Sequence, residues 1–440
     1  MDSYNSEKTS KPWLKRKLLH EHLAKTEGEN FTILADPLFD FALSRELNSG
    51  DNMYVNTRAV QLYASLYDKI TITSSFYETQ ADLPQYIDSY YNTFHVVPGE
   101  ARVKPFGNGA YDWGTAYATL GYQANSWLYV ETGNDKNFIG NGYRSMILSD
   151  YSPQYLYLKT SLHHGRFFYT NLAARTLNPN FNNISGSNSG WSENSLYEHK
   201  MMNINYFGVH VNNKIQAGIF EASMLGVHTR NAPKFTAFLP VINELAYAND
   251  SLHFLWGADI LICPSSYLPL GIYSQIVYDS RKAIAVQAGL SWTIFTSMGS
   301  CFLRGEWNMA SSGTYQSLND DNFWGHYNQP LSHPAGNNFN EWLVQLGWQF
   351  KRFQAFAHIG QTYYKAGISS RNIFNNNLND AEVPVRLLTA DVKMSYLVNP
   401  SYNWQVFMGI SYWNQPVSGE KYMIPSLGMK TFLRNRYFDF

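Results

Sequence analysis

Residues 324–337 carry the side chains that are best suited to binding a polar ligand. Amide groups such as that of Asn328 donate and accept hydrogen bonds, and rings such as those of Trp324 and Tyr327 can stack on a pyranose face. Loops often carry binding residues, and this segment is expected to form a loop. The alternative is a loop that folds into the protein interior as a plug and bonds mainly to itself. The candidate sugar contacts are Trp324, His326, Tyr327, Asn328, Gln329, His333 and Asn337.

A second polar segment spans residues 137–145, with Asn137, Gly140, Gly142, Arg144 and Ser145 as its candidate functional residues. Its glycines suggest a phosphate-binding loop, but the Lys-Ser/Thr pair of a P-loop is missing. A tight turn is favoured instead, because glycine permits positive φ. Arg144 would then bridge acidic residues in the protein interior or contact an anionic sugar.

The sequence shows no motif for catalysis or for a metal. It lacks a G-x-S-x-G elbow, and His326 and His333 have no carboxylate pattern beside them. The adjacent His163 and His164 would point to opposite faces of a strand. We therefore expect no enzyme activity, no cofactor and no metal.

Composition favours a membrane wall over a soluble domain. Aromatic residues make up 16% of the 440 residues, with 32 Tyr and 12 Trp, whereas charged residues make up only 15%. An ordinary soluble domain has about 25% charged residues. The net charge of −1 gives no basic surplus for a nucleic-acid partner. Two distant cysteines, Cys263 and Cys301, suit neither a disulfide framework nor a zinc site and are expected in the wall.

Apolar and polar residues alternate over several long runs. One face of the run 284–294 is entirely apolar, and the opposite face carries Gln287, Ser291 and Thr293. The run 402–412 has aromatic residues at both ends of its apolar row, which is typical of a strand that crosses a membrane. The clearest hairpin spans 341–360 with Lys351-Arg352 at its tip, and residues 67–69 form another short turn.

These patterns predict an all-β fold, an antiparallel transmembrane β-barrel of about 16–18 strands in the outer membrane of a Gram-negative cell. No window of about 18 apolar residues could form a helical span. A soluble sandwich or propeller also alternates, but its buried face would not be rich in Gln, Asn and Ser. The terminal Phe440, preceded by Phe438 and Tyr437, is a further feature of such barrels.

Two regions are expected. Residues 1–47 would form a helical, periplasmic segment with a helix of roughly 14 residues from Trp13, capped by Ser10. Residues 48–440 would form the barrel, with long outer loops at 173–200 and 308–340 and further non-strand stretches in 78–115 and 229–252. An outer-membrane protein is expected to carry a cleavable signal, yet Met1 to Ser10 include no apolar core of one.

Two charged residues of one predicted strand are expected to face the barrel lumen. Arg304 and Glu306 share a strand face by parity, and either charge would be costly in lipid. An ion-pair ladder is one interpretation of the pair, and a path for a substrate is the other.

The segments 133–149 and 325–339 resemble motifs of the Wzi family of capsule-assembly barrels, in particular its branch with the gliding-motility protein RemB. Weaker similarities lie at 18–23 and 219–221, and the resemblance covers residues 13 to 440. It implies a barrel of about 18 strands, with periplasmic helices and a largely closed lumen. It also implies a non-enzymatic role in attaching or organising surface polysaccharide.

Three functions therefore compete. The leading hypothesis is a barrel whose partners are outer-membrane lipid and exported surface polysaccharide, with a role in capsule attachment, adhesion or gliding. The rival is a passive outer-membrane channel, which a polar lumen fits equally well. The third is an accessory subunit of a secretion or adhesin assembly, whose partners would be other envelope proteins.

Overall fold

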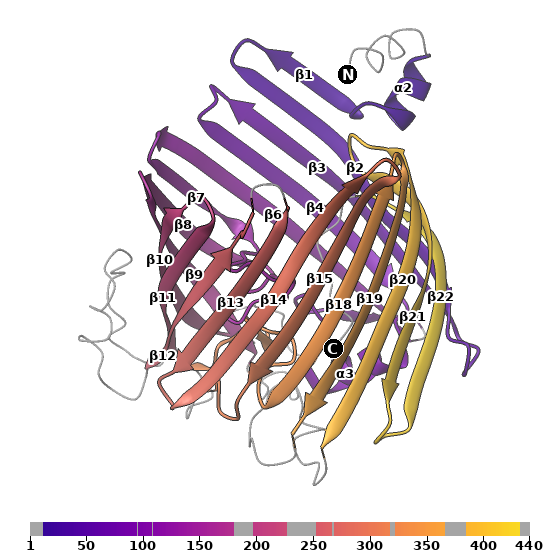
Figure 1. Cartoon of the computed structure of the whole chain (residues 1–440). Coiled ribbons are helices and arrows are strands. Elements are labelled where there is room, and N and C mark those ends of the chain that lie inside the picture. Colours follow the sequence, from indigo (N-terminus) through magenta and orange to yellow (C-terminus); the bar gives the residue numbers. More distant parts are fainter. Residues whose placement is uncertain are drawn as a thin grey trace.

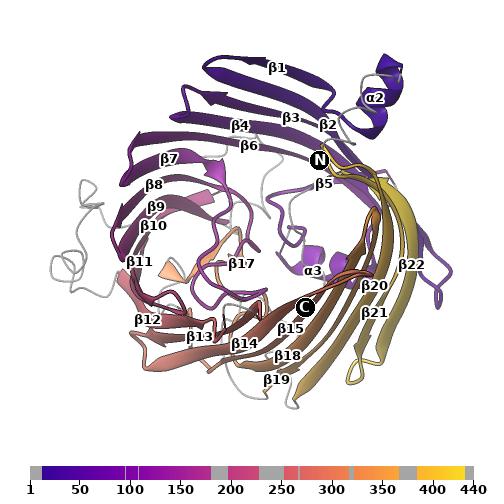
Figure 2. The same cartoon turned by 45° about the horizontal axis from the view of Figure 1, so that its top comes forward.

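Eighteen antiparallel strands close into a barrel in the computed structural model (Figure 1), and Figure 2 shows the ring that they form. The structure describes residues 12–94, 96–107, 109–179, 197–226, 252–265, 268–316, 322–365 and 384–431. Each wall strand pairs with the next along the chain, and the last pairs with the first through residues 40–44 and 426–430. This confirms the predicted fold class. The wall strands are β2 (Phe31–Arg45), β3 (Asn52–Leu66), β4 (Ile70–Ala81), β6 (Ala110–Asn125), β7 (Leu128–Asp135), β8 (Tyr155–His164), β9 (Phe167–Pro179), β10 (Tyr197–Asn212), β11 (Ile215–Gly226), β12 (Leu252–Ile262), β13 (Leu270–Asp279), β14 (Ala283–Thr296), β15 (Gly299–Ala310), β18 (Phe339–Phe350), β19 (Phe353–Tyr364), β20 (Val385–Asn399), β21 (Trp404–Gln415) and β22 (Glu420–Lys430).

The alternation seen in the sequence sets which side chains face lipid and which face the lumen. On β14, Ile284, Leu290 and Trp292 are exposed on the outside, whereas Gln287 is buried inside. Successive side chains of a strand point to opposite faces, so one apolar row per strand is enough to solvate the wall in lipid. The polar row is then free to bind whatever fills the lumen.

Aromatic side chains lie near both ends of the lipid-facing surface. On β18, Trp348 lies near one end of the strand and Trp342 near the other, and both are exposed. Trp292 and Trp307 repeat the arrangement on β14 and β15. Amphipathic rings favour the two interfaces of a bilayer, so these two rows mark the edges of the membrane.

The two ends of the barrel differ in how they connect the strands. At the upper end in Figure 1 the strands are joined mostly by tight turns, such as residues 67–69 and 351–352. Lys351 adopts φ 55°, as the tip of a tight hairpin requires. The longer connections gather at the opposite end. Short turns of outer-membrane barrels face the periplasm, so we assign the short-turn end to the periplasm and the long-connection end to the cell exterior.

The N-terminal helix is shorter than predicted. Helix α2 (Trp13–Leu19) has 7 residues and lies at the short-turn end (Figure 1). It ends early because the turn between β20 and β21 binds its last carbonyls: Asn399 Nδ2 donates to Lys17 O at 2.9 Å, and Ser401 Oγ donates to His20 O at 2.7 Å. The predicted cap, Ser10, lies outside the described residues.

The barrel wall begins well before residue 48. After α2, β1 (Ala24–Gly28) forms a hairpin with β2, and β2 is already a wall strand paired with β3. The sequence boundary was placed too late because Asp36 and Pro37 interrupt the apolar pattern of β2. One edge of β2 pairs with β1 through residues 31–35 and with β22 through residues 40–44. Pro37 lies between these two stretches, where that edge has no ladder hydrogen bond to make.

Two further expectations need correction or remain outside the structure. The expected loop 173–200 is strand at both ends, because β9 extends to Pro179 and β10 starts at Tyr197. The terminal Phe440 lies outside the described residues.

The two cysteines, Cys263 and Cys301, are free thiols. No helix within the described ranges is long and apolar enough to cross a bilayer.

Candidate functional site

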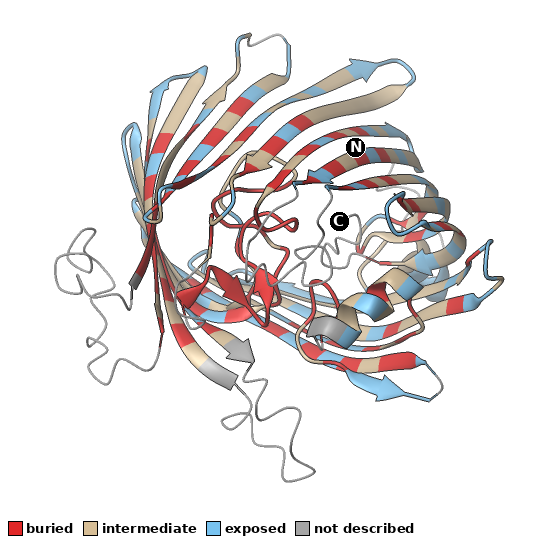
Figure 3. Ribbon diagram, turned by 90° about the horizontal axis from the view of Figure 1, so that it is seen from below, coloured by how far each residue is buried: buried red, intermediate tan, exposed pale blue. Residues whose placement is uncertain are grey.

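Three connections at the long-connection end fold back into the lumen. They are the described residues of 82–109, 136–154 and 311–338, which together we call the plug. They include helix α3 (Gln85–Phe94) and the short strands β5 (Lys104–Phe106), β16 (Gly325–His326) and β17 (Gln329–Pro330). Figure 3 shows the plug as a largely buried body inside the ring of strands. The ring of Tyr86 on α3 stacks at 5.0 Å on Trp413 of β21, so the plug also contacts the C-terminal wall.

A buried ion pair fixes the second segment of the plug to the wall. Arg144 donates to the carboxylate of Glu341 on β18, and the two side chains are only 1% and 2% exposed. His333 Nε2 lies 2.7 Å from the same carboxylate, which also accepts hydrogen bonds from Asn308 Nδ2 at 2.9 Å and Thr362 Oγ1 at 3.1 Å. Burying two charges is costly unless they are paired and hydrogen-bonded, and this network meets both conditions.

Inward-facing wall side chains hold the backbone of the same segment. Gln275 Oε1 accepts from Met146 N at 2.9 Å, and Gln287 Nε2 donates to Arg144 O at 2.7 Å. A chain segment without a sheet partner must satisfy its peptide groups in this way when it is buried. At Gly142 a Cβ atom would lie 2.7 Å from Glu306 Oε1, so only glycine fits there. The glycines of this motif therefore serve close packing against the wall.

The third segment is tied to the first and second. His326 Nδ1 accepts from Leu177 N at 2.9 Å, so its Nε2 carries the proton and donates to Gln154 O at 3.0 Å. Burial lowers the pKa of His326 to about 3 despite these hydrogen bonds. Gln329 joins two plug segments: its Oε1 accepts from Gly99 N at 2.6 Å and its Nε2 donates to Glu100 O at 2.7 Å.

The candidate sugar contacts of the third segment do not lie on an exposed loop. All seven side chains are at most 9% exposed, because the segment folds inward and its polar groups bind protein atoms. Trp324 Nε1, for example, donates to Ile147 O at 3.3 Å, and Asn337 Nδ2 donates to Thr314 O at 2.9 Å. Their placement corresponds to the alternative of a self-bonded plug. The seven are Trp324, His326, Tyr327, Asn328, Gln329, His333 and Asn337.

Arg304 and Glu306 lie on the lumen face of β15. Their closest charged atoms, Arg304 Nε and Glu306 Oε1, are 3.9 Å apart. Glu306 accepts a hydrogen bond from Tyr273 OH at 2.6 Å and another from Tyr143 N of the plug. The carboxylate therefore joins plug and wall.

Several residues that organise the site were not singled out in the sequence. Glu341 and Gln275 were detectable in principle, because both occupy lumen-facing positions of alternating strands. Lys200 was not, because its role depends on long-range contacts. Its ammonium donates to Phe323 O at 3.0 Å and to Gly325 O at 2.8 Å, both in the plug.

A polar pocket lies beside the plug on its periplasmic side. It has a volume of about 450 Å³ and lies between residues 136–141 and the inner faces of β8 to β12. Phe168 and Gln216 line it close to short turns, so the pocket faces the short-turn end. We call it the vestibule pocket. Its lining includes Asn137, Asn141, Lys159, Phe168, Tyr206 and Asp259.

The polar groups of the vestibule pocket are held in fixed positions. Asp259 accepts from Tyr206 OH at 2.8 Å and from Asn141 Nδ2 at 3.3 Å. Lys159 Nζ lies 2.5 Å from Glu131 and donates to Asn137 Oδ1 at 3.3 Å. The pocket thus combines fixed donors and acceptors with the aromatic ring of Phe168. In the part of the chain that the structure describes, no group of three or more His, Cys, Asp or Glu side chains could hold a metal ion.

Sequence comparisons give no relative, and structural comparisons give outer-membrane barrels. No family model matches the chain, and no curated protein matches it. The solved structure of Wzi from Escherichia coli, described as a carbohydrate-binding β-barrel involved in group 1 capsule assembly, is similar with a TM-score of 0.60 at 10% identity over 92% of this chain and 85% of that one. OccK1 (OpdK) from Pseudomonas aeruginosa is similar with a TM-score of 0.52 at 10% identity, over 92% and 98%. At these identities the likeness is one of fold. The chain is an outer-membrane β-barrel.

Proposed function

We propose that this protein is a non-enzymatic outer-membrane barrel that binds exported surface polysaccharide and helps to organise or attach it at the cell surface. The observation that carries the proposal is a rigid polar and aromatic pocket beside a lumen plug. A plug that is anchored by buried side chains obstructs the lumen, so the barrel is poorly suited to the free diffusion of solutes through it. A fixed pocket suits the binding of one ligand.

The vestibule pocket has the chemistry that a saccharide requires. The amides of Asn137 and Asn141 and the carboxylate of Asp259 can donate to or accept from sugar hydroxyls. Phe168 offers an apolar ring for the face of a pyranose. The volume lies within the range of about 300–1,000 Å³ that ligand pockets span. Lys159 adds a positive charge that favours an acidic sugar.

The similarity in fold to Wzi also supports the proposal of saccharide binding. That structure is described as a carbohydrate-binding barrel involved in capsule assembly. The polysaccharide role of the present chain, and a role in gliding as in the RemB branch, belong to this proposal.

The test is saccharide binding by the purified protein in detergent, first on a glycan array and then by calorimetry. Phe168→Ala is expected to weaken binding of the selected glycan about tenfold, because stacking on an aromatic ring contributes about 1–3 kcal/mol per base in the analogous nucleic-acid complexes. Phe167→Ala is the matched control, because Phe167 is the neighbouring ring on the outer face of β9. Two results together would refute the proposal. The purified wild-type protein would bind no glycan, and a strain that lacks the gene would keep its surface polysaccharide and its motility.

The rival function is a channel, and one observation favours it. The periplasmic half of the lumen carries charged side chains, among them Arg304 and Lys393, whose ammonium lies 3.9 Å from the ring centre of Phe407. The similar structures of the OccK group have comparable barrels. Single-channel recording separates the two functions: a silent barrel supports the proposal, and steady open currents support the channel.

A further inference from the structure

The barrel closes at an imperfect seam between its first and last wall strands. The ladder between β2 and β22 has five pairs, from Asp40 with Lys430 to Ser44 with Ser426. The next residue of β22 is Pro425, which has no N–H to donate. Backbone contact resumes only beyond it, where Leu47 N donates to Met423 O at 3.0 Å. The wall is therefore interrupted at one position near the long-connection end.

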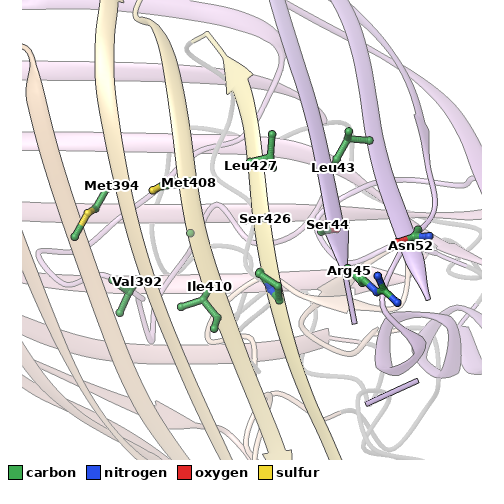
Figure 4. A pocket seen from close by; sticks show the side chains of 12 residues that line it. Leu43, Ser44, Arg45, Asn52, Val392, Met394, Met408, Ile410, Ser426 and Leu427 are labelled. Carbon is green, nitrogen blue, oxygen red and sulfur yellow. The ribbon is translucent and has the colours of Figure 1, made fainter. Parts of the chain in front are cut away.

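A hollow of about 570 Å³ lies on the lipid-facing surface at this interruption (Figure 4). Its floor includes the backbone of Gly409 and the compact ring of Pro425. Large apolar side chains surround the floor, and each is between 39% and 63% exposed on the outer face of the barrel. They are Leu43, Val392, Met394, Met408, Ile410 and Leu427.

The rim of the hollow is cationic on one side only. Arg45 and Asn52 are cross-strand partners at the long-connection end of the hollow. By strand parity, Lys421 and Arg386 also face outward near the same end of β22 and β20. On β2, β20, β21 and β22 these three cations are the outward-facing charges in the described strands. At the short-turn end, the outward positions on the same strands hold Tyr396, Trp404 and other uncharged residues.

Glu46, the carboxylate that follows Arg45 in the chain, is engaged by its own turn. Glu46 accepts hydrogen bonds from Asn48 N at 2.9 Å and from Ser49 N, so it is bound within its own turn. These hydrogen bonds lower the pKa of Glu46 although burial opposes them, and they stabilise its charged form. Arg45 remains exposed on the outer surface.

We propose that this hollow binds one phosphorylated glycolipid of the outer leaflet, of the lipid A type. An acyl chain would lie in the apolar hollow, and a phosphate would bind Arg45, with Lys421 as a further cation toward the cell exterior. Among the outward-facing strand positions of β2, β20, β21 and β22, the cations lie at the long-connection end of the described residues, which favours a lipid of the outer leaflet. Arginine suits this role because its guanidinium forms paired hydrogen bonds with phosphate. The site is independent of any saccharide bound in the lumen.

The test measures lipid binding by native mass spectrometry of delipidated protein, with added hexa-acylated lipid A, phosphatidylglycerol or phosphatidylethanolamine. We expect lipid A to bind at least tenfold more tightly than phosphatidylethanolamine, with a stoichiometry of one tight site. Arg45→Ala should weaken lipid A binding about tenfold. Leu427→Trp should weaken it by filling the hollow.

Matched controls distinguish this site from general contact with lipid. Arg58→Ala removes another exposed, outward-facing arginine on β3, and Leu346→Trp enlarges an exposed apolar residue on β18, away from the hollow. Both should bind lipid A as the wild type does. Equal binding of lipid A and phosphatidylethanolamine, or unchanged binding by both Arg45→Ala and Leu427→Trp, would overturn the proposal. Tight binding of phosphatidylglycerol instead of lipid A would assign the hollow to another lipid and also overturn it.

Discussion

The exterior half and the periplasmic half of the lumen are built from the same strands, yet their side chains lie in different surroundings. Phe339 and Phe356 face the lumen from the paired strands β18 and β19. Phe339, in the exterior half, is 0% exposed and stacks on His333 at 4.4 Å, whereas Phe356, in the periplasmic half, is 40% exposed. Strand alternation decides only the direction of a side chain. The segments that fold back from the connections decide whether that side chain becomes core.

The difference extends to charged groups. In the exterior half, Arg144 and Glu341 are buried together and bound by neutral neighbours. In the periplasmic half, Lys159 and Glu131 form a pair that keeps side-chain exposures of 26% and 17%. Removing one member of a buried ion pair lowers stability strongly, because the other charge is left buried without a partner. Removing one member of a solvated pair lowers stability little, because water solvates the remaining charge. The exterior half should therefore respond far more strongly to substitution.

The largest expected effect is that of Glu341→Gln. The substitution leaves the buried guanidinium of Arg144 without its counter-charge, and breaking such a pair costs about 3–5 kcal/mol. We expect faster hydrogen exchange in residues 136–154 and the appearance of open currents in planar bilayers. Glu78→Gln, at an exposed position on the outer face of β4, is the control. A silent barrel with unchanged exchange would show that the pair does not hold the plug.

The second test replaces each of the two phenylalanines of the comparison, Phe339 and Phe356, with alanine. Phe339→Ala should lower the free energy of unfolding by about 3 kcal/mol, since it creates a cavity in a packed core. Phe356→Ala should change the free energy of unfolding by less than about 1 kcal/mol, because that ring is already in contact with water. Denaturant titrations in lipid vesicles measure both. Equal losses would mean that the two halves are packed alike.

The third test uses pH. Because burial lowers the pKa of His326 to about 3, protonation favours the unfolded state below the ordinary pKa near 6.5. The plug is therefore fully stable above about pH 6.5 and loses stability as the pH falls toward 3. At pH 5 the loss is about 2 kcal/mol. Hydrogen exchange of residues 322–338, corrected for its intrinsic pH dependence, should report this loss, and His326→Gln should flatten the profile. A pH-independent plug in the wild type would contradict it.

The smallest effect is expected for Lys159→Met in the periplasmic half. The pair with Glu131 is partly solvated, so its loss should cost no more than about 1 kcal/mol of stability. Affinity for an acidic saccharide should nevertheless fall severalfold, which calorimetry can measure. A loss of stability as large as that of Glu341→Gln would mean that the vestibule pocket is as much a part of the core as the plug.

The wall could be predicted from the sequence because its rules are local. Period-two alternation gave the lipid-facing row of β14, and the short polar tip 351–352 gave the β18–β19 hairpin. These features depend on residues that are close in the chain. The short length of α2 could not be predicted, because Asn399 and Ser401, which bind its end, are almost 400 residues away.

The interior was only partly predictable for the same reason. Arg144 was expected to bridge acidic residues or bind an anion, but its partner Glu341 is 197 residues distant, and no local pattern connects them. Polar residues such as His326 and Gln329 look alike in sequence whether they serve an exposed loop or a buried plug. Their surroundings depend on where the first and second plug segments lie, and only the fold supplies that.

The docking of α2 has a consequence for the order of assembly. Its carbonyls are bound by a turn that exists only once β20 and β21 have formed, so α2 can reach its final position only after nearly all of the wall strands have been inserted. We expect protease protection around Lys17 to appear last during refolding into vesicles, as a marker that the ring is complete.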